Sequence, residues 1–80
     1  MQIRIRAFGI AKDILKAASL DYTLHEGATI RDLRDQLTQD YPDFARLTSL
    51  SFALDETYVD EQCLLTDQVE VILIPPVSGG

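Results

Sequence analysis

The chain has 80 residues, the length of one small domain with a single modest core, which makes a large active-site cleft improbable. A content of 46% apolar and 25% charged residues is that of an ordinary soluble globular protein and argues against disorder. Thirteen acidic against seven basic residues give a net charge of −6, which disfavours nucleic-acid and membrane-surface roles and favours a basic patch on a protein partner.

The first segments predict a strand, a short helix and a second strand. Residues 2–8 alternate apolar and polar side chains, so one wet face of the strand carries Arg4 and Arg6, with Phe8 on the same side. Residues 10–18 have apolar residues at helical spacing and predict one or two helical turns, with a stripe of Ile10, Ile14 and Ala18 or of Ala11, Ile14, Leu15 and Ala18. Residues 19–25 alternate again and predict a strand before a turn at Gly27.

The best helix of the chain is expected to begin after Thr29. The Thr29 hydroxyl can cap the first turn, and Asp32 three residues later completes an acidic variant of the capping box. An apolar stripe follows at spacings of three and four residues: Ile30, Leu33, Leu37 and Tyr41. Because Pro42 disfavours helical conformation at the residue before it, the helix is expected to end near Asp40.

The second half of the chain predicts three more strands. Residues 43–49 look irregular, residues 50–54 alternate as a third strand, and a turn at Asp55-Glu56 leads to a short fourth strand at Tyr58-Val59. Residues 60–67 are expected to form a loop with Leu64 and Leu65 packed beneath it. The last strand, residues 68–74, is nearly all apolar in its second half, which is typical of a central strand.

The order of these elements predicts an α+β fold. A mixed sheet of four to five strands, with one main and one short helix packed on it, is the compact arrangement for this order. Residues 1–74 are expected to form the domain and residues 75–80 an extended C-terminal tail.

Few side chains are suited to catalysis. His25, the only histidine, is interpreted as a solvent-exposed turn residue, and Cys63 as an inert thiol that is at least half-buried. One histidine and one cysteine do not make a metal site. The acidic cluster of Asp55, Glu56, Asp60 and Glu61 lacks the spacing of a calcium loop. We therefore expect no metal, no bound cofactor and no self-contained catalysis. The single cysteine also excludes an internal disulfide, which predicts a reducing cytoplasm, and neither a membrane span nor a signal peptide is expected.

The tail carries the main functional signal, although a frayed terminus is its simplest interpretation. Pro75 and Pro76 fix two φ angles and favour an extended conformation, so the chain is expected to leave the last strand stiffly. The residues after Ile74 reach about 20 Å when extended, through Val77 and Ser78. Gly79 and Gly80 lack side chains, so the terminal carboxylate can enter a narrow channel and a separate enzyme can activate it, for example as an acyl-adenylate. The tail thus predicts a domain whose reactive group is its own C-terminal carboxyl group.

The ending IPPVSGG, the length and the order of elements resemble the molybdopterin synthase small-subunit (MoaD) family of ubiquitin-like sulfur carriers. The resemblance covers the whole chain. Residues 64–71, LLTDQVEV, are similar to the family pattern PLxDGDEV; Gln68 stands where that pattern often has an acidic residue, and the loop lacks the usual glycine.

This resemblance implies a β-grasp fold and a carrier function. An adenylating enzyme related to ubiquitin-activating enzymes would use ATP to activate Gly80. A sulfur donor of the cysteine desulfurase or rhodanese type would then convert the adenylate to a thiocarboxylate. The tail would insert into the large synthase subunit, with Gly79 fitting the channel, and sulfur would pass to cyclic pyranopterin monophosphate in molybdenum cofactor biosynthesis. Two large and two small subunits would form a heterotetramer.

The resemblance also implies a partner-docking patch near the tail, formed by Phe8, Tyr58 and Ile74. Three alternatives stay open. The chain could carry sulfur for thiamine, cysteine or tRNA thiolation, act as a ubiquitin-like protein modifier, or be a passive interaction domain with an incidental tail.

Overall fold

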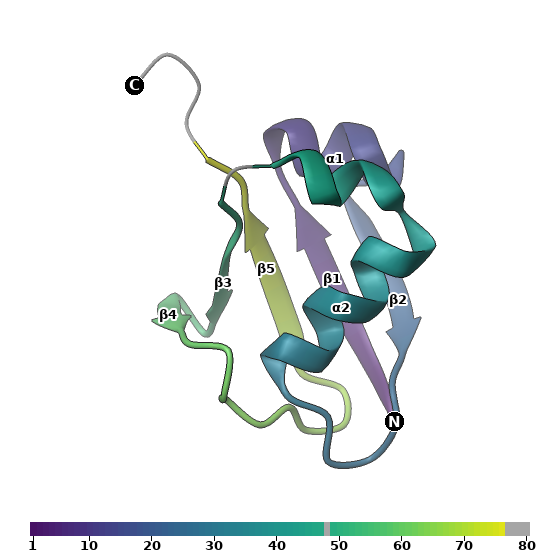
Figure 1. The fold of residues 1–80 in the computed structure, drawn as a ribbon. Coiled ribbons are helices and arrows are strands. Elements are labelled where there is room, and N and C mark those ends of the chain that lie inside the picture. The colour runs from purple at the N-terminus through teal and green to yellow at the C-terminus, as the bar shows by residue number, and fades with distance from the viewer. Residues whose placement is uncertain (48, 77–80) are drawn as a thin grey trace.

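A five-stranded mixed sheet carries the helices on one of its faces (Figure 1). The computed structural model describes residues 1–47 and 49–76. The strands are β1 (Gln2–Ala7), β2 (Ser19–Thr23), β3 (Ser51–Leu54), β4 (Thr57–Val59) and β5 (Glu70–Ile74). The helices are α1 (Gly9–Leu15), α2 (Ile30–Asp40) and the 3-10 helix η1 (Pro42–Arg46). The predicted α+β architecture is therefore confirmed.

The strand order is β2-β1-β5-β3-β4, so the last strand of the chain lies at the centre of the sheet, as its apolar sequence predicts. β5 pairs in parallel with β1 and antiparallel with β3. Because β1 and β5 run in the same direction, both end at one edge of the sheet. Phe8, which follows β1, and Pro75, which follows β5, are thereby brought to the same edge.

The two faces of the sheet differ in composition. The face beneath the helices, called the covered face here, is apolar and excludes water; its strand residues and the α2 residues that pack on them include Ile3, Ile5, Val71, Leu73, Ile30, Leu33 and Leu37. The opposite face, called the open face, presents the alternate residues of the same strands, including Arg4, Arg6, Glu70, Ile72 and Ile74. The period-two alternation of side chains produces this division.

Helix α2 begins and ends where the sequence predicts. The backbone N–H of Thr29 donates to Asp32 Oδ2 at 3.0 Å, and the N–H of Asp32 donates to Thr29 Oγ1 at 3.3 Å, so the capping box is complete. The hydrogen bond from the Thr29 backbone lowers the pKa of the Asp32 carboxyl group. The helix ends at Asp40, two residues before Pro42.

Helix α1 is shorter than predicted. It ends at Leu15 instead of residue 18, because Lys16 takes the left-handed conformation, with φ of 59°, and closes the helix. Ala11 and Leu15 are buried while Ile10 is 48% exposed, so the stripe that begins at Ala11 is correct except for the exposed Ala18. Strand β2 likewise ends at Thr23, before the predicted residue 25.

The predictions for the second half need two corrections. The segment expected to be irregular contains η1, which begins with Pro42 and buries Phe44. Leu65 is buried as predicted, but Leu64 is 65% exposed. Leu64 forms an isolated antiparallel bridge with Thr29, and in such extended backbone neighbouring side chains point in opposite directions, so only one of the two leucines can face the core.

The turn before β5 is built without glycine. Gln68 has a φ of 69°, in the left-handed region, so it takes the place of the glycine in PLxDGDEV and not, as the sequence analysis expected, that of an acidic residue. The N–H of Gln68 donates to the carbonyl of Gln2 at 2.7 Å, and Asp67 Oδ1 accepts from the N–H of Gln2 at 2.9 Å. These bonds tie the turn to the start of β1 and extend the parallel pairing of β1 with β5.

Candidate functional site

The arm, defined here as residues 75–80, starts at the edge where β1 and β5 end. Its first residue, Pro75, lies against the backbone of Gly9: a Cβ atom added to Gly9 would stand 3.4 Å from Pro75 Cγ. Gly9 also has a positive φ of 56°, which favours glycine there for a second reason. Pro75 and Pro76 are both half-buried, so the described part of the arm is in contact with the domain.

The other predicted tail residues, Val77, Ser78, Gly79 and Gly80, lie outside the described residues. Their predicted roles as the channel segment and as the acyl group that is activated stay predictions. So does the proposed division between the domain and the tail, although β5 ends at Ile74.

The three predicted docking residues share the open face. Phe8 follows β1 in extended conformation, so it continues the alternation of Arg4 and Arg6, and it is 50% exposed. Ile74 is half-buried on the same face of β5. Tyr58 on edge strand β4 is 68% exposed and stands opposite Ala53. The sheet thus places on one face residues that lie far apart in the sequence.

The strand register adds two residues between them. Ala53 of β3 pairs with Tyr58 on one side and with Ile72 of β5 on the other, so the three side chains form a row across the open face. We call Phe8, Ala53, Tyr58, Ile72 and Ile74 the open-face patch. The sequence analysis did not single out Ile72 as a docking residue, although its alternation with Ile74 was a usable signal.

A positive charge lies beside this patch. Ile72 pairs with Arg6 of β1, and the Arg6 guanidinium carbon lies 5.8 Å from the centroid of the Phe8 ring. This distance is within the range of a cation–π interaction, which holds the guanidinium over the aromatic face. Arg6 and Phe8 are two residues apart on one extended segment, so the alternation already placed both on the same side.

The other reactive side chains lie away from the arm. His25 is exposed, with Nε2 3.6 Å from Asp32 Oδ2, and half-buried Cys63 accepts a bond from the N–H of Ile30 with its carbonyl. Both therefore adjoin the start of α2, at the opposite end of the domain from the end of β5 (Figure 1). Within residues 1–47 and 49–76, His, Cys, Asp and Glu form no group of three that could hold a metal ion.

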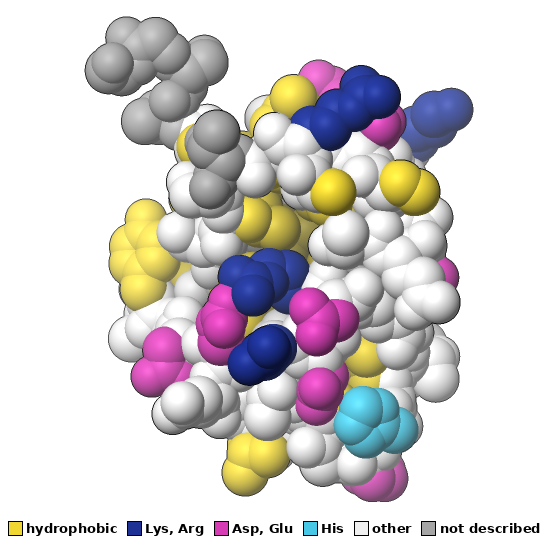
Figure 2. Space-filling view, in the orientation of Figure 1, with side chains coloured by type: hydrophobic (Ala, Val, Ile, Leu, Met, Phe, Trp, Pro, Cys, Tyr) yellow, Lys and Arg dark blue, Asp and Glu magenta, His cyan; other side chains and the backbone are white. Residues whose placement is uncertain are grey.

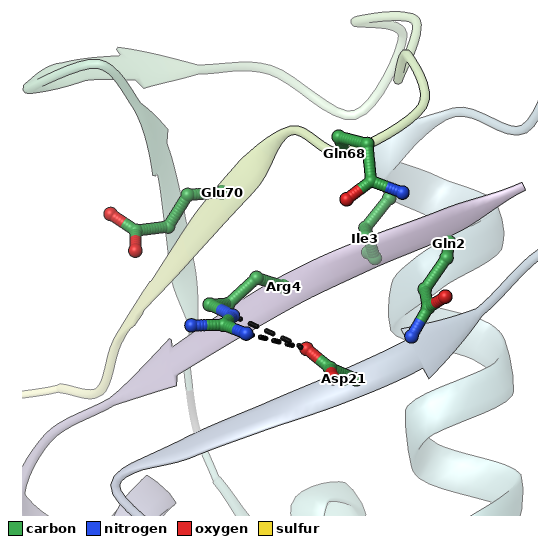
Figure 3. A pocket seen from close by; sticks show the side chains of 6 residues that line it. All are labelled: Gln2, Ile3, Arg4, Asp21, Gln68 and Glu70. Atoms are coloured by element: carbon green, nitrogen blue, oxygen red, sulfur yellow. Dashed lines mark hydrogen bonds and ion pairs between the residues drawn. The ribbon is translucent and has the colours of Figure 1, made fainter.

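The helix side of the molecule carries interspersed charges of both signs (Figure 2). One pair there joins Arg34 of α2 to Glu61 of the loop between β4 and β5. On the open face, a shallow depression of about 450 Å³ lies at the edge away from the arm, lined by Gln2, Ile3, Arg4, Asp21, Gln68 and Glu70 (Figure 3). No polar or charged residue of the described chain is buried, so this depression has no enclosed binding group.

None of the described helices has the length and apolar character needed to span a membrane.

The mixed sheet and the single long helix crossing it define a ubiquitin-like β-grasp protein. The sequence profile described as the ThiS family matches residues 5–80, and the chain belongs to this family. A molybdopterin synthase sulfur carrier subunit of Chlamydomonas reinhardtii is 32% identical over 83 residues, with both chains covered completely. Another, of Arabidopsis thaliana, is 26% identical over 81 residues, which cover all of this chain and 84% of the relative.

Solved structures confirm the fold. A Pyrococcus furiosus protein provisionally named molybdopterin converting factor subunit 1 has a TM-score of 0.87 and 21% identity, with 96% of this chain and 99% of that chain covered. SAMP1 of Haloferax volcanii has a TM-score of 0.83 and 18% identity, with both chains covered completely. A chain in the complex of subunits 1 and 2 of the Helicobacter pylori molybdopterin-converting factor has a TM-score of 0.69 and 26% identity over the whole of both chains. The resemblance to molybdopterin synthase small subunits is therefore confirmed.

Proposed function

We propose that this chain is the sulfur-carrier subunit of a molybdopterin synthase. The observation that carries the proposal is the similarity to the Chlamydomonas reinhardtii carrier subunit, which spans the full length of both proteins. The Pro75-Pro76 segment at the edge of the sheet supports it, because a carrier needs its reactive end held away from its own body. The proposal includes the cytoplasmic location expected from the single cysteine.

The proposed reaction cycle uses the carboxyl group of Gly80. An adenylating enzyme related to ubiquitin-activating enzymes joins this carboxylate to the α-phosphate of ATP and releases pyrophosphate. The terminal sulfur of a persulfide on a cysteine desulfurase or rhodanese-type donor then displaces AMP from the acyl-adenylate. A thiol cleaves the resulting acyl disulfide, forming a disulfide with the donor sulfur and leaving the transferred sulfur on the carrier as a thiocarboxylate. Attack of the thiocarboxylate sulfur on cyclic pyranopterin monophosphate in the large subunit's pocket displaces an oxygen substituent and forms the new carbon–sulfur bond. Water then cleaves the acyl–sulfur bond, which leaves the sulfur on the acceptor and regenerates the Gly80 carboxylate.

The proposed partner is the large synthase subunit, which receives the arm. Two observations support this assignment. A similar chain occurs in the Helicobacter pylori complex of the two subunits. In addition, the open-face patch adjoins the base of the arm, so a protein that binds the arm can also cover exposed Phe8. We propose that two carriers and two large subunits form a heterotetramer.

Intact mass spectrometry tests this function. The purified chain is incubated with ATP, the adenylating enzyme and a sulfur donor, and the expected mass gain corresponds to replacement of one oxygen by sulfur at Gly80. The control lacks only Gly80; it should retain the folded far-ultraviolet circular dichroism spectrum and gain no sulfur. Failure of the full chain to gain sulfur, or sulfur transfer by the shortened chain to cyclic pyranopterin monophosphate, would contradict the proposal.

The alternative functions predict other results when the chain is recovered from cell extracts. A protein modifier gives adducts in which Gly80 is joined to lysine side chains of other proteins. A carrier for thiamine, cysteine or tRNA thiolation gains sulfur but copurifies with a different acceptor enzyme. The structural likeness to SAMP1, at 18% identity, supports the fold and does not favour either alternative.

A further inference from the structure

The charged side chain beside the open-face patch has the opposite sign to the net charge of the whole protein. The chain has a net charge of −6, which favours a basic partner. The charged side chain that adjoins Phe8 and Ile72, however, is Arg6, and it is exposed. The surface that covers this patch therefore meets a cation among apolar groups.

Arg6 makes no ion pair within the described part of the chain. Arg4 lies two residues earlier on the same face and pairs with Asp21 of the neighbouring strand β2. The distance between Arg4 Nη2 and Asp21 Oδ1 is 3.2 Å (Figure 3). In the register, Arg4 also stands opposite Glu70, whereas Arg6 stands opposite Ser19 and Ile72. Among residues 1–47 and 49–76, the fold thus supplies carboxylates to one arginine of β1 and leaves the next one beside the Phe8 ring.

A partner that covers the patch removes the Arg6 guanidinium from water and must replace the interactions that the solvent made with it. Removing a charge from water costs several kcal/mol unless a counter-charge with good geometry replaces the lost solvent. A carboxylate matches the planar fork of arginine with two parallel hydrogen bonds, and a cation already held over an aromatic ring loses little side-chain freedom on pairing. Arginine and aromatic residues are also the residue types that most often dominate binding energy at interfaces.

We infer that the protein receiving the arm presents an aspartate or glutamate to Arg6, inside an apolar surface that covers Phe8 and Ile72. This inference rests on the proposed function, which names the large synthase subunit as that protein. It assigns Arg6 as a residue that selects the partner, separate from the arm that carries the sulfur.

Charge reversal gives a test whose sign distinguishes an acidic from a basic partner surface. The dissociation constant for the large synthase subunit is measured by calorimetry for the wild type, Arg6→Lys, Arg6→Gln and Arg6→Glu. The matched control is Arg31→Glu, which changes the net charge equally; Arg31 is exposed on α2, on the other side of the sheet. Circular dichroism melts verify that each variant folds, and Arg6→Gln keeps the test valid if Arg6→Glu does not.

The expected order of affinity is wild type, Arg6→Lys, Arg6→Gln and then Arg6→Glu. Binding should weaken by about tenfold for Arg6→Gln and about a hundredfold for Arg6→Glu, with less than about a threefold change for Arg31→Glu. Unchanged or tighter binding of Arg6→Glu, beside normal binding of the wild type, overturns this inference and leaves the proposed function intact. Absence of wild-type binding overturns the proposed partner and this inference together.

Discussion

The two faces of the sheet are made from the same strands and have different roles. On β5, Leu73 is fully buried beneath the helices while its neighbour Ile74 is half-buried on the open face beside the arm. The covered face excludes water and supplies the stability of the domain. The open face keeps apolar side chains that the fold itself does not need to bury. A period of two residues therefore separates the core of the domain from the proposed docking patch along one strand.

The largest effect should come from breaking the covered face. Leu73→Ala removes a fully buried side chain and leaves a cavity, and we expect the free energy of unfolding to fall by about 3 kcal/mol. Ile74→Ala, one residue along the strand, should cost about 1 kcal/mol or less. Urea denaturation of the two variants measures the contrast. Equal losses at the two positions would show that both faces contribute alike to stability.

Binding should respond in the opposite way to a change at Phe8. Phe8 is the N-cap residue of α1 and provides no side-chain cap, so a serine there can cap the helix while removing the aromatic ring. Phe8→Ser should change the free energy of unfolding by less than about 1 kcal/mol, yet weaken binding to the large synthase subunit by about tenfold or more. Leu64→Ser, at another exposed apolar residue near the start of α2, is the control and should bind normally. Loss of stability without loss of binding would assign Phe8 to the core.

A smaller effect is expected where β2 meets the end of α2. The Tyr22 hydroxyl donates to Asp40 Oδ2 at 2.5 Å, and burial, together with this bond, raises the pKa of Tyr22 well above its ordinary value. Tyr22→Phe should cost about 1 kcal/mol at neutral pH. The raised pKa means that the folded state favours the neutral hydroxyl. The extra stability of the wild type over Tyr22→Phe is therefore fully present below about pH 10, where the unfolded tyrosine is also neutral.

As the pH rises above that value, the unfolded state loses its proton first and the advantage of Tyr22 declines. Chemical denaturation of both proteins at pH 7 and at alkaline pH measures this difference. Tyr41 and Tyr58 are present in both proteins, so the comparison isolates the Tyr22 hydroxyl. A difference between the two proteins that grows with alkaline pH would contradict the assigned role of the hydroxyl.

The smallest effect concerns backbone conformation, which belongs to neither face. Gln68 has a positive φ, so Gln68→Gly should raise the free energy of unfolding by about 0.5 kcal/mol, the relief of strain being partly offset by greater freedom of the unfolded chain. Gln68→Ala keeps the strain and should give no gain. Thermal melts of the three proteins suffice. A loss of stability in the glycine variant would mean that the Gln68 side chain contributes more than its backbone costs.

The sequence predicted best those features that depend on short-range patterns. Thr29 and Asp32 identified the start of α2, and the apolar end of residues 68–74 identified the central strand. The early end of α1 was missed because Lys16 takes a conformation that is unusual for lysine. The exposure of Leu64 was missed because it follows from a bridge to Thr29, 35 positions earlier in the chain.

The candidate site was predictable only in part for the same reason. Phe8 and Ile74 stood out because each departs from the polar pattern of its strand. The row from Tyr58 through Ala53 to Ile72 depends on how β4, β3 and β5 are paired, which no local pattern encodes. That Arg6 stands opposite Ser19 and Ile72, and not opposite a carboxylate of the two neighbouring strands, is likewise a property of the register of β1.

The parallel pairing of β1 with β5 has a consequence during synthesis on the ribosome. In the middle of the sheet, the first strand of the chain pairs with the last. A polypeptide that lacks residues 70–74 therefore has no central strand and cannot complete its core. Folding therefore waits for the segment that immediately precedes the arm. Every copy that reaches the native state then includes Ile74, the residue that precedes the arm.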